Sequence, residues 1–360
     1  MKLVTVIGAR PQFIKAAAVS RVVRDSYEGL IEEVIIHTGQ HYDKNMSDVF
    51  FNELDIPVPK YNLNVSGGRH GEMTGRMLEG IESLLLKEKP DYVLVYGDTN
   101  STLAAALAAV KLHIPVAHVE AGLRSFNMKM PEEINRVVVD RVSSLLFCPT
   151  ETGSENLARE NVLEGVHVVG DVMFDAALFY EELSKNKSKI LEKHNLSPNA
   201  FVLATCHRAE NTDSPERLLG IISALGEIAE STPIVLPLHP RTKALIASNK
   251  MEYLLEKVTV TDPCTFLDMI ALEQAAKVII TDSGGVQKEA YFYQTPCITM
   301  RDETEWVETV ASGWNQLVGA NKADIVSAFE SRRTPSMNEI SPYGDGNAAS
   351  KILNILKSAI

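Results

Sequence analysis

The sequence predicts an α/β protein made of two doubly wound parallel sheets. Strand-like apolar runs alternate with amphipathic helical segments along the chain, which is typical of parallel α/β architecture. The pattern stops at a polar stretch, residues 181–199, and then starts again, so the whole doubly wound unit occurs twice. At 360 residues the chain is also long for a single hydrophobic core. We therefore expect two domains, with residues 181–199 as the connection between them.

Short apolar runs are expected as the strands, because parallel strands are buried on both faces. In the first half these are residues 3–7, 33–37, 92–96, 116–119, 145–148 and 167–169, with helices at 12–24 and 99–112 among the segments between them. In the second half they are residues 201–205, 234–236, 258–260, 278–280, 297–299 and 316–318. Open α/β sheets bind ligands beyond the carboxyl ends of their strands, and most of the unusual polar residues follow a strand. We expect the two sheets to face one cleft there.

Charge and composition exclude several classes of function. The formal net charge of −12 argues against non-specific binding to nucleic acid or to an anionic membrane. Any phosphate must therefore be bound by local groups. The N-terminal run MKLVTVIGARPQ is expected to be a first strand and not a signal peptide, and no window approaches the roughly 20 apolar residues of a membrane span.

The cysteines indicate the redox compartment. Cys148, Cys206, Cys264 and Cys297 are scattered, with no CxxC pair and no zinc-site spacing. Isolated thiols in a chain of this size indicate a reducing, cytoplasmic compartment. Cys148 and Cys297 lie in apolar strand-like runs, so both are expected to be buried packing residues.

The stretch IITDSGGVQKEA is the first candidate for a ligand site. It predicts a buried strand, a turn and a helix that begins near residue 286, with Asp282 and Ser283 as N-cap residues. Gly284 and Gly285 let a ligand approach the backbone, and a helix N-terminus favours phosphate. Glu289, one turn further on, is spaced to accept hydrogen bonds from a ribose diol. The alternative is an ordinary capped βα unit, but the acid at this spacing favours a nucleotide diphosphate site.

Two cations follow the first expected strand. Arg10 lies beside Pro11 in the segment Gly-Ala-Arg-Pro, and Lys15 comes about one helical turn later. The segment matches neither the GxGxxG loop of dinucleotide-binding proteins nor the GxxxxGK loop of P-loop proteins. Arg10 and Lys15 are either cations for a phosphate or carboxylate of a ligand, or surface charges at a helix start.

Acidic residues follow two further strands and open the next helix. Asp98 ends the third expected strand, Glu120 follows the fourth, and Glu132 and Glu133 lie just after Pro131. Each has a simple structural alternative: Asp98 as an N-cap, and Glu132 and Glu133 as first-turn acids favoured by the helix dipole. Clustered carboxylates raise each other's pKa values and can divide into acid and base roles, so together they favour a catalytic site.

Histidines follow two strands of the second half. His207 lies in the segment HRAEN and His239 lies in LHPR. Histidine suits proton transfer or binding of a phosphate oxygen. A metal pair is the alternative, but no acidic or cysteine ligands stand around them at metal-site spacing, so no metal is expected.

Ordered motifs along the chain resemble those of the non-hydrolysing UDP-N-acetylglucosamine 2-epimerases. The motifs are GARPQFIK, GDTNST, HVEAGLRS, MPEEINR, HRAEN, TDSGGVQKEA and SPYGDG. The resemblance runs from Lys2 to the last helix. It implies a GT-B-like fold of two Rossmann-type domains, residues 1–168 and 169–346, with a C-terminal helix, residues 347–360, that packs back on the first domain. It also implies a homodimer without a nicotinamide cofactor or metal.

The implied reaction inverts C2 of a UDP-2-acetamido sugar for surface-polysaccharide synthesis. A base removes the C2 proton while UDP leaves C1, which gives a 2-acetamidoglycal; UDP adds back after proton delivery to the opposite face. Carboxylates near C2, groups that stabilise the departing diphosphate, and a closed cleft that excludes water meet the needs of this chemistry. The sequence leaves open which acid serves as the base.

Residue by residue, the resemblance implies the following roles. The catalytic acids are Asp98, Glu120 and Glu132, the functional histidine is His207, the cations of the first loop are Arg10 and Lys15, the diphosphate-binding turn is Ser283, Gly284 and Gly285, and the ribose-binding acid is Glu289. His239 is expected to bind substrate from its place after a strand.

The chain departs from the bacterial pattern of the family at several positions. Ala9 and Gln12 stand where Thr and Glu are usual, and Trp306 replaces an arginine that contacts substrate in the family. Ala209 replaces an arginine of substrate-activated members, whereas Gln40 and His41 match their regulatory pocket. These departures resemble the branch that acts on UDP-2,3-diacetamido-2,3-dideoxy-glucuronic acid, which we favour as substrate over UDP-GlcNAc.

Two other functions fit the same fold. A retaining GT-B glycosyltransferase would share the nucleotide site but would need an acceptor. A non-catalytic nucleotide-sugar-binding protein would be expected to lack one of the three catalytic carboxylates, and all three are present. Fold analogy alone does not choose among these functions. A dehydrogenase is disfavoured because the glycine fingerprint is absent.

Overall fold

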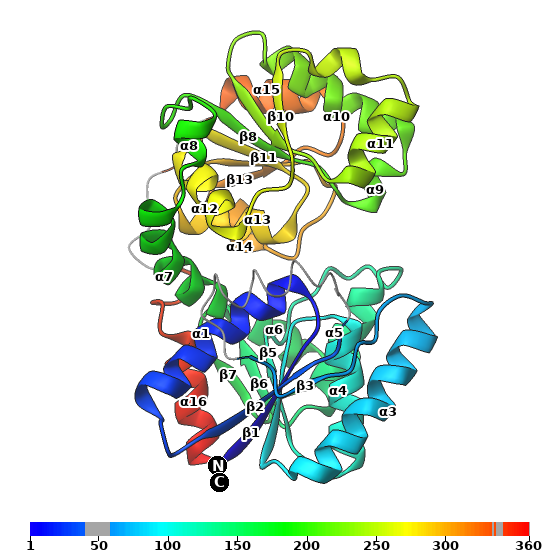
Figure 1. Ribbon diagram of the computed structural model, residues 1–360, viewed down its shortest axis with the longest axis vertical. Helices are drawn as coiled ribbons and strands as arrows, with labels where there is room; N and C mark the ends of the chain where they lie inside the picture. The colour runs from blue at the N-terminus through cyan, green and yellow to red at the C-terminus, as the bar shows by residue number, and fades with distance from the viewer. Residues whose placement is uncertain (40–57, 333–334, 336–340, 360) are drawn as a thin grey trace. The chain divides into compact units, whose positions relative to one another are not determined.

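The chain folds into two compact units, which are described separately. The computed structural model describes residues 1–39, 58–332, 335 and 341–359, without the side chain of Arg10. Unit 1 comprises Met1–Ala176 and Ile340–Ile360, and unit 2 comprises Ala177–Glu339. Figure 1 shows a parallel sheet flanked by helices in each unit.

Unit 1 contains a seven-stranded sheet in the order β3-β2-β1-β4-β5-β6-β7, in which all paired neighbours are parallel. The strands are β1 (Lys2–Ile7), β2 (Glu32–His37), β3 (Tyr61–Asn62), β4 (Tyr92–Tyr96), β5 (Val116–Val119), β6 (Leu145–Cys148) and β7 (Val166–Val168). Every residue of β4 is buried, as expected for a central parallel strand covered by helices on both faces.

The helices of unit 1 cover both faces of this sheet. They are α1 (Arg10–Ser26), α3 (His70–Glu88), α4 (Asn100–Lys111), α5 (Pro131–Val142), α6 (Glu151–Arg159), the start of α7 (Val172–Lys187) and α16 (Ala348–Ser358). Helices α3, α4 and α5 pack side by side, and α1 packs against α16. Alanines of α4 pack against valines of β1 and β4 in the core, where their small side chains let the helix lie close to the sheet.

The C-terminal helix is fastened to unit 1 by polar contacts as well as by packing. The Tyr27 hydroxyl donates to Asn354 at 2.6 Å. The Asp175 carboxylate accepts hydrogen bonds from the backbone N–H groups of Ala348 and Ala349 at 3.0 and 2.8 Å. These N–H groups belong to the first turn of α16 and have no acceptor within the helix, so Asp175 serves as a cap from another segment.

Unit 2 contains a six-stranded parallel sheet in the order β10-β9-β8-β11-β12-β13. The strands are β8 (Val202–Thr205), β9 (Ile234–Pro237), β10 (Val258–Thr261), β11 (Val278–Thr281), β12 (Cys297–Thr299) and β13 (Asn315–Leu317). The helices are α8 (Ile190–Lys193), α9 (Ala209–Thr212), α10 (Pro215–Ile228), α11 (Pro240–Ser248), α12 (Phe266–Ala275), α13 (Gly284–Phe292), α14 (Val307–Ala311) and α15 (Lys322–Ser331), with a 3₁₀ turn at Glu252–Leu255.

Each sheet has one point at which the strand order reverses. In unit 1 this point lies between β1 and β4, and in unit 2 it lies between β8 and β11. Loops that leave these strands in opposite directions open a crevice at their carboxyl ends, where open α/β sheets bind ligands. The turns that begin at Gly8 and Gly97 flank this point in unit 1, and those at Cys206 and Asp282 flank it in unit 2.

The α/β fold class and the expected strands are confirmed, with ends that shift by one or two residues. The prediction that residues 181–199 connect the two domains is wrong. Residues 181–187 continue α7, and residues 190–193 form α8. Both segments belong to unit 2, which begins at Ala177, within α7. The polarity of this stretch reflects exposed helix faces, such as the Lys185 pairs with Glu181 and Glu182.

Candidate active site

The site in unit 1 is built around Gly97, the residue after β4. Gly97 has φ +61, and a Cβ there would lie 3.2 Å from Glu120 Oε2 and 3.4 Å from Lys15 Nζ. Lys15 and Glu120 form a buried ion pair that lies against this glycine. Glu120 has φ +69, a left-handed conformation that is unusual for a residue with a side chain and is often found at functional sites.

Asp98 is held by an arginine and is not an N-cap. Thr99 caps α4 by accepting a hydrogen bond from Thr102 N. The Asp98 side chain is 29% exposed, and its Oδ2 accepts hydrogen bonds from Nε and Nη2 of Arg136. The Asp98 carbonyl accepts a hydrogen bond from Asn135 Nδ2 at 2.8 Å. Helix α5 therefore holds the Asp98 backbone and carboxylate together.

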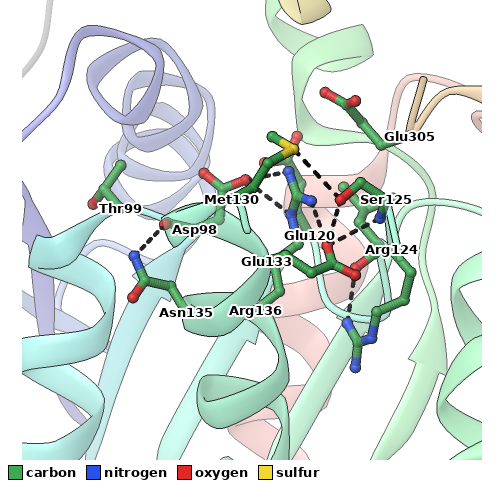
Figure 2. A network of polar contacts seen from close by, with 12 residues as sticks. Asp98, Thr99, Glu120, Arg124, Ser125, Met130, Glu133, Asn135, Arg136 and Glu305 are labelled. Carbon is green, nitrogen blue, oxygen red and sulfur yellow. Dashed lines mark hydrogen bonds and ion pairs between the residues drawn. The ribbon is translucent and has the colours of Figure 1, made fainter. Parts of the chain in front are cut away.

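The adjacent acids Glu132 and Glu133 have different environments. Glu133 is 1% exposed and accepts hydrogen bonds from Ser125 N, Ser125 Oγ and Phe126 N at 2.9, 3.1 and 2.9 Å. Its Oε2 also accepts a hydrogen bond from Arg136 Nη1 at 2.8 Å (Figure 2). Burial alone would raise the pKa of Glu133, but these hydrogen bonds and the Arg136 charge bring it below its ordinary value. Glu132 is exposed and makes no hydrogen bond or ion pair with any described residue.

A buried polar chain underlies these turns. His118, on β5, contacts Asp140 Oδ1 through Nδ1 at 2.7 Å and the Gly97 carbonyl through Nε2 at 2.8 Å. Asp140 Oδ2 accepts hydrogen bonds from Gly122 N at 3.1 Å and from Arg124 at 2.7 Å. Burial acts to raise the pKa of Asp140, but the hydrogen bonds and charges of His118 and Arg124 outweigh it and lower the pKa.

The site in unit 2 lies at the N-terminus of α13. Ser283 is the N-cap and accepts a hydrogen bond from Val286 N, and the helix begins at Gly284, two residues earlier than predicted. A Cβ on Gly284 would lie 2.7 Å from Glu305 Oε1, so only glycine fits there without displacing that side chain. Gly285 is exposed, with Ser283 Oγ and Glu289 Oε2 each 3.9 Å from the position that a Cβ would take.

Asp282 organises the neighbouring turn and does not cap α13. Its buried carboxylate accepts hydrogen bonds from the backbone N–H groups of His207, at 3.1 Å, and Arg208, at 3.0 Å, and from Asn211 Nδ2 at 3.2 Å. The His207 ring is half exposed, with its Nδ1 3.6 Å from Asp282 Oδ1. The structure therefore brings the HRAEN turn and the first turn of α13 together.

His239 is exposed at the start of a helix, whereas Trp306 is buried against a lysine. His239 is exposed and is the N-cap of α11, where Nδ1 accepts a hydrogen bond from Arg241 N at 3.3 Å. Trp306 is buried, and Lys288 Nζ lies 3.9 Å from the centre of its ring system. Such a cation–π contact is favourable when the ammonium group is desolvated, as that of the buried Lys288 is.

Some residues named from the sequence lie outside the described part of the chain. Gln40, His41 and the Arg10 side chain are not described. Among the described residues, no cluster of three His, Cys, Asp or Glu side chains is arranged to hold a metal ion. Within the same ranges, no helix has the length and apolar character needed to cross a membrane. The cysteines are free thiols, and burial raises the pKa of both Cys148 and Cys297 to about 12.

Comparison with known proteins identifies the family. The family model for UDP-N-acetylglucosamine 2-epimerase matches residues 26–357. The chain belongs to this family. Its members are isomerases. The chain is 53% identical to a UDP-2,3-diacetamido-2,3-dideoxy-D-glucuronate 2-epimerase from Pseudomonas aeruginosa, over 99% of each chain. It is also 53% identical to a UDP-N-acetylglucosamine 2-epimerase homolog from Methanococcus maripaludis, over 99% of this chain and 100% of that one.

Solved structures of the same family share the fold. The crystal structure of Methanocaldococcus jannaschii UDP-GlcNAc 2-epimerase in complex with UDP-GlcNAc and UDP matches with a TM-score of 0.91 and 45% identity, covering 99% of this chain and 100% of that chain. The Neisseria meningitidis enzyme bound to UDP-GlcNAc matches with a TM-score of 0.88 and 32% identity, again over 99% and 100%. The GT-B-like fold class is therefore confirmed for this epimerase-family chain.

Three residues of α5 hold the turns of this site, and of these the sequence had indicated only Glu133, as an acid that could be catalytic or a first-turn residue. Glu133, Arg136 and Asp140 contact Ser125 and Phe126, Asp98, and His118, respectively. Their spacing of three and four residues puts them on one face of the helix, and that face is buried. A polar stripe at helical spacing beside the apolar run Val137–Val139 was the signal that could have revealed them.

Proposed function

We propose that the protein inverts C2 of a UDP-2-acetamido sugar by elimination and re-addition of UDP through a 2-acetamidoglycal intermediate. Membership of the 2-epimerase family supports the reaction class. The observation that carries the proposal is the pair of acidic turns around Gly97, where Glu120 lies against the glycine and Asp98 is the next residue. Removal of a proton from one face of C2 requires a base, and delivery of a proton to the other face requires an acid; neighbouring carboxylates can fill both roles.

Asp98, Glu120 and Glu132 are the proposed acid–base groups. Among the described residues, Asp98 Oδ1 has no hydrogen-bond partner, so this oxygen is available to a substrate while Arg136 holds Oδ2. Glu132 lies in the first turn of α5, four residues before Arg136, and its exposed carboxylate is the third acid of the proposed group. We propose that the ion pair with Lys15 orients Glu120, and that Arg10 is the second cation of the first turn.

Unit 2 is the proposed UDP-binding unit. The first N–H groups of α13, at Gly284 and Gly285, have no acceptor within the helix and are available to a diphosphate, as helix N-termini are in other phosphate sites. His207 is proposed to contact the diphosphate, and His239 to contact the substrate. Glu289 is proposed to accept hydrogen bonds from the ribose hydroxyl groups. Positive groups fixed before reaction stabilise the charge that develops on departing UDP.

The proposed substrate is UDP-2,3-diacetamido-2,3-dideoxy-glucuronic acid, with UDP-GlcNAc as the second candidate. The Pseudomonas aeruginosa relative, named for the diacetamido-glucuronate, supports this choice. Trp306 supports it as well, because a buried indole stands where the family resemblance places a substrate-contacting arginine, and the indole contacts Lys288 of α13. A substrate with an added carboxylate would require a different arrangement of cations in its pocket.

The direct test is incubation of the purified protein with each sugar nucleotide and no acceptor, followed by proton NMR of the products. The proposal predicts a manno-configured UDP-sugar from either substrate, with higher kcat/KM for the diacetamido-uronate. Higher kcat/KM for UDP-GlcNAc would reverse the substrate assignment. Conversion that depends on an added acceptor would favour a glycosyltransferase, and binding without conversion by the folded wild-type protein would favour a nucleotide-sugar-binding protein.

The setting of the enzyme is also a proposal. We propose a homodimer in the cytoplasm that makes precursors for surface polysaccharides. The resemblance to the family supports the dimer, and free cysteines, three of them buried, support a reducing compartment. Sedimentation equilibrium tests the dimer: a mass near twice 39.6 kDa is expected, and a monomer at micromolar concentration would contradict it.

A further inference from the structure

His118 bridges the two turns that carry Asp98 and Glu120. Its ring is fully buried, between α5 and the end of β4. Nε2 lies 2.8 Å from the carbonyl oxygen of Gly97, the residue before Asp98. His118 itself lies two residues before Glu120 on β5. One imidazole therefore connects the Gly97 turn to β5, the strand that ends just before Glu120.

Counting hydrogens limits the His118–Asp140 pair to two protonation states. A carbonyl oxygen accepts but does not donate, so the contact with Gly97 requires a hydrogen on Nε2. The contact between Nδ1 and Asp140 Oδ1 also requires one hydrogen, carried either by the ring or by the carboxyl group. In the first case His118 is an imidazolium ion, and in the second case Asp140 is a neutral acid.

The surroundings of Asp140 favour the carboxylate. Its other oxygen, Oδ2, accepts hydrogen bonds from Gly122 N and from the Arg124 guanidinium. Arg124 is in turn held by Glu160, the C-cap residue of α6, through Nε and Nη2 at 2.7 and 2.8 Å. A buried carboxylate with two donors on one oxygen, one of them cationic, is stabilised in its charged form. The remaining hydrogen therefore belongs to Nδ1.

The hydrogen bond from His118 affects Asp98 and Glu120 because Gly97 is closely packed between them. Its left-handed φ of +61 would strain any other residue, and a Cβ would lie tightly against the Lys15–Glu120 pair. A small shift of its carbonyl would move the Asp98 backbone and change the packing against Glu120. A hydrogen bond from a charged donor is stronger than one from a neutral donor, so an imidazolium holds this carbonyl more firmly than a neutral ring would.

We propose that His118 carries hydrogens on both ring nitrogens and, fixed by Asp140, positions the Gly97–Asp98 turn against Glu120 for proton transfer. The positioning role rests on the proposed function of Asp98 and Glu120. The charged groups around the ring are Asp140 on α5, Arg124 in the loop after β5, Glu160 just after α6, and the Lys15–Glu120 pair on the far side of Gly97.

The protonation state is tested by ¹H–¹⁵N NMR of protein labelled in histidine, with His118→Gln to assign the ring. The proposal predicts two protonated nitrogens for His118 at about pH 8, where an unperturbed histidine is neutral. Asp140→Asn keeps the side-chain shape but can donate to Nδ1, so in this variant the ring is expected to carry a hydrogen on Nε2 alone. A single protonated nitrogen in the wild type would overturn the proposal.

The positioning role is tested by kinetics of Asp140→Asn. We expect kcat to fall roughly 10-fold or more, with KM within about 2-fold, because misplacement of reacting groups slows chemistry more than it weakens binding. The exposed Asp25 provides the control Asp25→Asn, for which both constants should stay unchanged. Unchanged kcat in folded Asp140→Asn would overturn the positioning role. Absence of turnover by the wild type itself would instead overturn the proposed function, and the NMR result is independent of that outcome.

Discussion

Arg136 donates hydrogen bonds from both Nε and Nη2 to a single oxygen of Asp98, Oδ2, at 2.9 and 2.6 Å. The third nitrogen of the same guanidinium, Nη1, donates to Glu133 Oε2. One buried cation thus connects a proposed catalytic acid to the carboxylate that fixes the Ser125–Phe126 backbone. The planar, forked guanidinium can make these contacts together, whereas a lysine ammonium is a point donor on a flexible stem.

Arg136→Lys is therefore expected to lower kcat by about 10²-fold, because the Asp98 carboxylate loses its fixed orientation. Steady-state kinetics with the preferred UDP-sugar, together with thermal melting to confirm folding, checks this outcome. Arg141→Lys is the matched control, since Arg141 is an exposed residue of the same helix. Equal activity of the two variants would contradict a role for Arg136 in holding Asp98.

Glu132→Gln and Glu133→Gln separate catalysis from structure at neighbouring positions. Glu132→Gln is expected to lower kcat roughly 10²- to 10⁴-fold with an unchanged melting temperature, because the exposed carboxylate is a proposed acid–base group. Glu133→Gln is expected to lower the free energy of unfolding by about 1 to 3 kcal/mol, because a buried acceptor of several hydrogen bonds is replaced. Steady-state kinetics and chemical denaturation of both variants test these roles. A stability loss in Glu132→Gln and an activity loss alone in Glu133→Gln would make Glu133 the catalytic acid and Glu132 the structural one.

Asp175 gives unit 1 a pH dependence opposite in sign to that of an ion-paired acid. Burial raises its pKa to about 6 from an ordinary value of 3.8, Asp171 and Asp345 add to the rise, and the N–H groups of α16 only partly offset it. The folded state therefore binds this proton more tightly than the unfolded state does. As a result, the contribution of Asp175 to the free energy of unfolding falls as pH rises through the window between these two values.

Asp175→Asn removes this titration. Relative to the wild type, the variant is expected to gain about 3 kcal/mol of unfolding free energy between roughly pH 4 and pH 7, as a pKa change of about two units implies. Chemical denaturation of both proteins across this range measures the gain. A stability difference that does not vary with pH would show that the Asp175 carboxyl group titrates normally.

Trp306→Arg tests the cation–π contact in unit 2. The new guanidinium would lie beside the Lys288 ammonium, now 3.9 Å from the indole, so the free energy of unfolding is expected to fall by about 1 to 3 kcal/mol. Adding Lys288→Glu should recover part of the loss, since opposite charges then meet. A double-mutant cycle measures this coupling. Strict additivity of the two changes would show that residues 288 and 306 do not interact.

The main features of the fold could be predicted because buried apolar runs of strand length, such as residues 92–96, alternate with longer amphipathic segments along the chain. The caps were harder to predict. Asp98, Thr99, Asp282 and Ser283 are all good capping residue types, yet only Thr99 and Ser283 cap helices. The two aspartates instead accept hydrogen bonds from groups distant in the sequence, and residue type and spacing do not reveal such partners.

The candidate site shows the same limit. The residues next to strand ends pointed to the correct turns, because the sheet brings those turns to one edge. The sequence did not distinguish the exposed Glu132 from the buried Glu133, since both are first-turn acids. It also gave no sign that Lys15 pairs with Glu120, because the two residues belong to elements separated by more than 100 positions.

Transfer of the C2 proton is the central claim, and proton NMR of the reaction in deuterated water tests it most directly. The account predicts that deuterium enters at C2 of the manno-configured product as it forms, and that Asp98→Asn lowers this incorporation together with turnover. Epimerisation with full retention of the C2 proton would contradict the mechanism, and absence of both epimerisation and exchange with either UDP-sugar would contradict the assigned activity.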